Sequence, residues 1–214
     1  MKKANIFIAF LMTIGFTVLT SLILAIDYYI TRIWSIAYIV GYLVMIVVLA
    51  KFFKDELKSN IKTFKSDLKN NWRKVLTITI LLTLLLYISN YLIVRYMGSL
   101  SENEIMAQSK LIASPILMGI SIVILGPIVE EMIYRLPFGR IEKYKLLTFF
   151  IYSLIFAMAH IALTNGMKEF IYLIPYMFLS LSIGYSFYKT GNIYMSIIVH
   201  ILNNLINVMV LLFL

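Results

Sequence analysis

Long apolar segments, separated by stretches that hold most of the charged residues, dominate this 214-residue chain. A helix of about 20 apolar residues crosses the hydrocarbon core of a bilayer, and helices satisfy their own backbone polar groups there. Seven segments reach or approach that length: Ala4–Ile26, Ile33–Phe53, Val75–Met97, Leu111–Tyr134, Leu146–Leu163, Phe170–Tyr188 and Ile193–Leu214. The sequence therefore predicts an all-α protein, a polytopic transmembrane helix bundle of about seven spans, located in the cell membrane as a multi-pass protein.

The composition excludes a water-soluble globule. Hydrophobic residues make up 62% of the chain and charged residues only 14%, against about a quarter charged in an ordinary soluble domain. The chain has no cysteine. Disulfides, thiolate zinc sites, iron–sulfur clusters and a cysteine nucleophile are therefore excluded.

The basic residues fall between alternate apolar segments. Nearly all of the 19 Lys and Arg residues lie on one side, and the exceptions are Arg32, Arg95, Lys110 and Lys168. The positive-inside rule then predicts a cytoplasmic N-terminus and an external C-terminus. Lys2 and Lys3 precede the first segment as in a signal sequence, but its length favours a retained span. The net charge of +9 is thus explained by topology and by contact with the lipid bilayer, and we expect no nucleic-acid partner.

The 54–74 stretch is the one long loop between predicted spans. Apolar residues recur there every three or four positions, at Leu57, Ile61, Phe64, Leu68 and Trp72. This spacing predicts an amphipathic helix lying on the inner leaflet. Such a helix can dock a partner or sense lipid, or it can simply connect two spans at the interface, and we favour the connector.

Glu130, Glu131, His160 and His200 lie inside apolar segments, whereas nearly every other charged residue lies in a loop or at the end of a segment. An ionisable side chain in a bilayer costs a few kcal/mol or more unless it is paired or faces water. Residues four apart share one face of a helix, so Glu131 can pair with Arg135. Glu130 is turned about 100° away and stays outside that pair.

Two more pairs share this four-residue spacing. Phe156 can pack on His160, and His200 lies on one helix face with Asn204. Each histidine alone is explained as a hydrogen-bonded core residue, and histidine and asparagine commonly link helices in membranes. Two glutamates, two histidines and an asparagine on three nearby segments favour one shared site.

The residues of this site can activate water. Glu130 would take the proton of the water, His160 would position the water, and His200 and Asn204 would donate hydrogen bonds to an oxyanion. Alternatively Glu130, His160 and His200 could bind a divalent metal such as zinc, which would activate the water. A cavity open to the cytoplasm would accommodate such a site.

This pattern resembles the CPBP intramembrane endopeptidases, the CAAX-processing, bacteriocin-processing and Abi-like proteins. Their motifs E-E-x-x-x-R, F-x-x-x-H and H-x-x-x-N read here Glu130-Glu131…Arg135, Phe156…His160 and His200…Asn204. The resemblance implies catalytic roles for Glu130, His160, His200 and Asn204, with support from Glu131, Arg135 and Phe156. It also implies a catalytic core over 111–214. The apolar segments predict N-terminal transmembrane spans over 1–110, which the motifs do not cover.

The expected activity is hydrolysis of a peptide bond in a peptide precursor or membrane-associated protein, as in bacteriocin or pheromone processing or self-immunity. No cofactor is required unless the divalent metal is present. Two alternatives stay open: a non-catalytic scaffold that regulates a sensor kinase or gives bacteriocin immunity, with a membrane-protein partner, and a transporter or proton relay.

Overall fold

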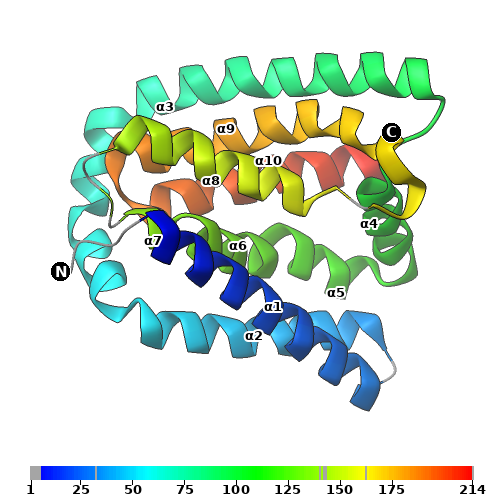
Figure 1. The fold of residues 1–214 in the computed structure, drawn as a ribbon, viewed down its shortest axis with the longest axis horizontal. Helices are drawn as coiled ribbons and strands as arrows, with labels where there is room; N and C mark the ends of the chain where they lie inside the picture. Colours follow the sequence, from blue (N-terminus) through cyan, green and yellow to red (C-terminus); the bar gives the residue numbers. More distant parts are fainter. Residues whose placement is uncertain (1–5, 32, 140, 142–143, 162, 214) are drawn as a thin grey trace.

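The computed structural model describes residues 6–31, 33–139, 141, 144–161 and 163–213 (Figure 1). Helices form this part of the chain, and no strand occurs within it, so the all-α prediction is confirmed. In chain order the elements are α1 Ile6–Thr31, α2 Trp34–Phe52, α3 Lys54–Met97, α4 Glu102–Ala113, α5 Pro115–Ile120, a π-helix η1 Ser121–Leu125, α6 Gly126–Tyr134, α7 Leu136–Gly139, α8 Lys145–Ala159, a 3₁₀ segment η2 Leu163–Tyr172, α9 Leu173–Thr190 and α10 Ile193–Phe213.

Six of the described helical stretches are long and apolar enough to cross a membrane. They confirm the predicted multi-pass membrane protein. The fifth predicted segment, Leu146–Leu163, is the exception in length. It forms α8, an apolar helix of 15 residues that ends at Ala159, and the chain continues in 3₁₀ conformation from Leu163.

The amphipathic 54–74 stretch is helical, as predicted, but it is not a separate element. It is the first part of α3, a single helix of 44 residues. No Gly or Pro interrupts the chain until Gly98, whose φ of 73° ends the helix. Figure 1 shows the cyan first part of α3 lying across the ends of the other helices and the rest running along the bundle.

The α9–α10 turn fixes this first part of α3. The side chain of Asn192 donates to the carbonyl of Asn60 at 2.7 Å and to the Asp67 carboxylate at 2.9 Å. In return Asn60 Oδ1 accepts from the backbone N–H of Ile193 at 2.6 Å, which caps the start of α10. The left-handed Gly191 (φ 70°) makes the tight turn that brings these groups together.

The fourth predicted segment is divided into several helices. Pro115 disfavours helical backbone at Ser114, and α4 ends at Ala113 in front of it. Helix α4 itself was not predicted, although Ser101 caps its start: Ser101 Oγ accepts from the Glu104 N–H at 3.2 Å and donates to the Glu104 carboxylate at 3.1 Å. Further along, the π-helix η1 stands directly before α6 and Pro127.

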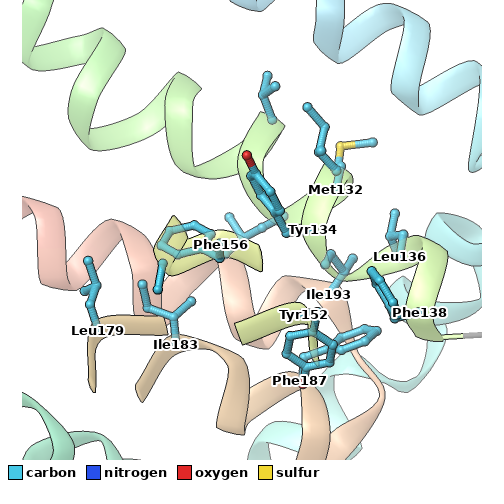
Figure 2. Packing of buried hydrophobic residues seen from close by; sticks show 14 of the residues in the cluster. Met132, Tyr134, Leu136, Phe138, Tyr152, Phe156, Leu179, Ile183, Phe187 and Ile193 are labelled. Carbon is cyan, nitrogen blue, oxygen red and sulfur yellow. The ribbon is translucent and has the colours of Figure 1, made fainter. Parts of the chain in front are cut away.

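Helices α6 to α10 pack against one another and against α1, α2 and α3 in one hydrophobic core. Figure 2 shows Tyr134, Phe156 and Tyr152 meeting aliphatic side chains from α9 and α10. Aromatic rings contact one another edge-on here, as between Tyr134 and Phe156 at 5.3 Å. Phe156 of this packed layer contacts the polar residues His160 and His200.

Candidate active site

A cavity of about 490 Å³ contains the four predicted catalytic residues. Glu130 comes from α6, His160 from the end of α8, and His200 and Asn204 from α10. Tyrosines of α2, polar residues of α3 and α4, and the start of α9 complete the wall. The structure thus brings together the residues that the sequence assigned to one site.

Glu131 lies beneath the cavity at the centre of a fully buried polar network. Its carboxylate is 3.3 Å from Arg135 Nε, and both side chains are inaccessible to solvent. The predicted i,i+4 pair is therefore present. Glu131 also accepts hydrogen bonds from Ser196 and from His200 Nδ1, the latter at 3.1 Å. Several donors on one buried carboxylate offset the cost of removing its charge from water.

Arg135 is held by more than its glutamate. Its guanidinium donates to Ser180 Oγ at 3.2 Å and to the Tyr152 carbonyl at 3.4 Å. The same group lies over the rings of Tyr152 and Phe156, at 4.7 and 4.9 Å from their centres. Arg135 therefore links α6 to α8 and α9 below the cavity.

His200 lies between the two glutamates. Because a carboxylate only accepts, Nδ1 donates to Glu131, while Nε2 faces Glu130 Oε2 at 3.7 Å. Glu130 is the accessible one of the two acids, with 28% of its side chain exposed. With Nδ1 engaged, Nε2 can donate to a substrate oxygen only when the ring carries both protons.

His160 is oriented by its own helix. Its Nδ1 lies 2.8 Å from the Phe156 carbonyl, and a carbonyl only accepts, so the neutral ring leaves the Nε2 lone pair free. Phe156 packs on His160 at 4.4 Å between ring centres, as the spacing predicted. The same ring meets His200 edge-on at 5.7 Å. Phe156 therefore separates and positions the two imidazoles.

Asn204 supplies a hydrogen-bond donor that Pro127 lacks. In η1 the N–H of Gly126 bonds the Ser121 carbonyl, five residues back. The next carbonyl in that register, Ile122, faces Pro127, which has no N–H. Asn204 Nδ2 donates to this carbonyl at 2.9 Å. One N–H of the Asn204 amide is thereby fixed, and the other stays available at the cavity wall.

Residues 112–206 match the family described as Type II CAAX prenyl endopeptidase Rce1-like. This segment is similar to that family. The match confirms the predicted resemblance to the CAAX-processing group and supports a protease. The chain matches neither a curated protein nor a solved structure in the same comparisons.

The Rce1-like segment includes all seven motif residues, and sequence reasoning missed one of their partners. Ser196 bonds Glu131 and lies four residues before His200. Ser196, His200 and Asn204 therefore form one polar stripe at four-residue spacing on α10. That spacing in an apolar helix was the signal that could have found Ser196.

A resident metal finds no prepared site in the described part of the chain. No group of three or more His, Cys, Asp or Glu side chains there is arranged to hold an ion. His200 Nδ1 is engaged by Glu131, and Nε2 is 3.7 Å from Glu130.

Proposed function

We propose that this protein is an intramembrane endopeptidase in which Glu130 activates the attacking water. The observation that carries the proposal is the different environment of two adjacent acids. Glu131 is fully buried among Arg135, His200 and Ser196, whereas Glu130 faces the cavity beside His200. The match of residues 112–206 to a protease family supports the same reading.

Apart from the attacking water, the proposed reaction uses only side chains of this protein. Glu130 takes a proton from a water that His160 Nε2 holds by hydrogen bonding. The resulting hydroxide attacks the carbonyl carbon, and the carbonyl oxygen becomes an oxyanion. Asn204 and protonated His200 donate to this oxyanion. The proton then passes to the amide nitrogen, with His160 assisting, and the carbon–nitrogen bond breaks to give an acid and an amine.

The substrate that we propose is a peptide precursor or a membrane-associated protein. The cavity is large enough for a bound segment, since ligand sites usually span about 300–1,000 Å³. Most of the wall surface is apolar, and its polar groups include the predicted catalytic residues and polar side chains of α3 and α4. An extended peptide buried there would present one carbonyl to the catalytic residues.

The decisive experiment compares peptides in membranes and medium, by mass spectrometry, from cells that produce either the wild type or Glu130→Gln at matched levels. Gln keeps the size and hydrogen bonding but cannot act as a base, and general-base catalysis contributes about 10²–10⁴ in rate. We expect a defined peptide to disappear and its precursor to accumulate. Glu56→Gln, the same change outside the cavity, should leave the profile unchanged.

Two other outcomes contradict the proposal. Identical profiles for wild type and Glu130→Gln, with a phenotype that persists in the variant but is lost when the first part of α3 is removed, would favour the scaffold. Loss of the peptide on treatment with a chelator, followed by recovery with zinc, would replace the metal-free mechanism with the metal-dependent one.

A further inference from the structure

The cavity occupies only one half of the bundle. The lining residues of its wall include residues from the first turns of α2, the last turns of α3 and α10, the start of α9, and α4. Tyr38, Asn90, Glu104 and Asn207 are representative of this lining. Figure 1 shows α4 at the end of the bundle opposite α7. We call these two ends the α4 end and the α7 end.

Buried side chains close the way from the cavity to the α7 end. Directly below Glu130 stand Glu131 and Arg135, both fully buried, followed by Leu136 and Phe138 at 3% and 1% exposure. A second cavity of about 240 Å³ at the α7 end shares no lining residue with the first. Among the described residues, the lining of the space around Glu130 therefore lies toward the α4 end, and buried side chains separate it from the α7 end.

The two ends of the bundle also differ in charge. The basic first part of α3, Lys145 and Lys189 belong to the α7 end. Among the described residues, the Lys and Arg side chains of the α4 end are Arg95, Lys110 and Lys168. The positive-inside rule places the α7 end in the cytoplasm and the α4 end outside it. In this orientation the cavity lining lies toward the non-cytoplasmic side, which differs from the expectation of a cavity open to the cytoplasm.

We propose that substrates reach Glu130 from the non-cytoplasmic side, through the cavity mouth beside α4. This inference rests on the proposed protease function and restricts its substrates. They would be peptide segments exposed on that side, as in a translocated peptide or the external end of a membrane protein. The described lining carries the Glu104 and Glu130 carboxylates and no Lys or Arg, so neutral or basic segments fit it.

The absence of cysteine from the chain allows a direct test by single-cysteine labelling. Ala107→Cys lies in the cavity wall on α4, and Ser109→Cys is exposed on the same helix outside that wall. Ser66→Cys is exposed on the first part of α3. With a membrane-impermeant maleimide on intact cells, we expect the two α4 variants to be labelled. Ser66→Cys should react only after permeabilisation.

The same cells then test the entry route. Labelling of Ala107→Cys should remove the peptide that depends on Glu130, compared with the same variant before labelling. Labelling of Ser109→Cys should leave that peptide unchanged. The proposal is overturned if the α4 cysteines react only after permeabilisation, or if blocked Ala107→Cys still yields the peptide. Maleimide labelling measures the accessibility of each cysteine and needs no substrate. The protease function is tested separately, by the peptide profile of Glu130→Gln. Failure of the protease proposal can therefore be distinguished from failure of the proposed entry side.

Discussion

At the scale of single residues, two adjacent glutamates of α6, Glu130 and Glu131, have different roles in the site. Glu131 is oriented inward and holds Arg135, Ser196 and His200 in place. Glu130 is turned toward the cavity, and its Oε2 lies 3.7 Å from His200 Nε2. Such a division follows from helix geometry, because successive residues differ by about 100° in direction. A structural acid and a reactive acid can therefore stand next to each other in sequence.

This division predicts opposite effects for the same substitution at the two positions. Glu131→Gln leaves Arg135 buried without its counter-charge, and breaking a buried pair costs about 3–5 kcal/mol. Glu130→Gln lies on a partly exposed wall and should change stability by less than about 0.5 kcal/mol while removing activity. Thermal unfolding of the purified proteins in detergent measures the difference.

A double variant distinguishes loss of the charge pair from loss of packing. Adding Arg135→Met to Glu131→Gln removes the uncompensated charge, so part of the stability should return. A double variant no more stable than Glu131→Gln alone would contradict the assigned role of the pair. Equal destabilisation by Glu130→Gln would contradict the division between the two acids.

The sequence predicted side-chain contacts within a helix but not contacts between helices. Glu131–Arg135 and Phe156–His160 follow from a four-residue spacing and are present as predicted. The bond from His200 to Glu131 joins residues 69 positions apart. No local rule specifies such a contact, because it depends on how α6 and α10 pack. The sequence was enough to predict which residues carry the chemistry, whereas their contacts with other helices could be identified only from the structure.

At the scale of elements, α8 and α9 approach closely below the site. A Cβ placed on Gly184 would lie 2.9 Å from Tyr152 Cε2 and 3.5 Å from Arg135 Nε. Tyr152 also donates to the Gly184 carbonyl at 3.0 Å. Glycine therefore lets α9 pack directly on the ring that covers Arg135, as small residues do between membrane helices.

The close approach predicts that Gly184→Ala destabilises the protein by about 1–3 kcal/mol, because a packed core does not accept an extra methyl group without displacement. Gly119→Ala is the matched control, since the nearest atom to its Cβ would be 4.0 Å away. That control should be neutral or slightly stabilising, because alanine favours helix. Thermal unfolding in detergent compares both, and equal stability of the two variants would refute the packing argument.

Hydropathy located the long helices, but it could not specify how helices are interrupted. Apolar length predicts a span and ignores whether its hydrogen-bond register is regular. The π-helix before Pro127 and the end of α8 at Ala159 are therefore absent from the prediction. The N-cap at Ser101 could have been predicted from the sequence, yet the surrounding polar residues of α4 made the segment resemble a loop.

At the scale of the whole molecule, both halves of the chain build the cavity. Tyr38 and Tyr42 of α2 and Asn90 of α3 line it together with the Rce1-like segment. Helix α3 also runs beside α9, where Thr83 and Ser182 are within hydrogen-bond distance at 3.4 Å. The predicted division after residue 110 cuts through α4, which spans Glu102–Ala113. The catalytic core is therefore not expected to be an independent folding unit.

A split protein tests this interdependence. We expect fragment 99–214 alone to be degraded or to yield none of the peptide that depends on Glu130, because α9 and the cavity wall lose their partners. Production of 1–98 in the same cells should restore both the fragment and the peptide, since this cut falls between α3 and α4. The pair 1–110 and 111–214 is the matched control, and it should restore less because it divides α4. Accumulation of active 99–214 alone would show instead that the Rce1-like half folds and works without the N-terminal spans.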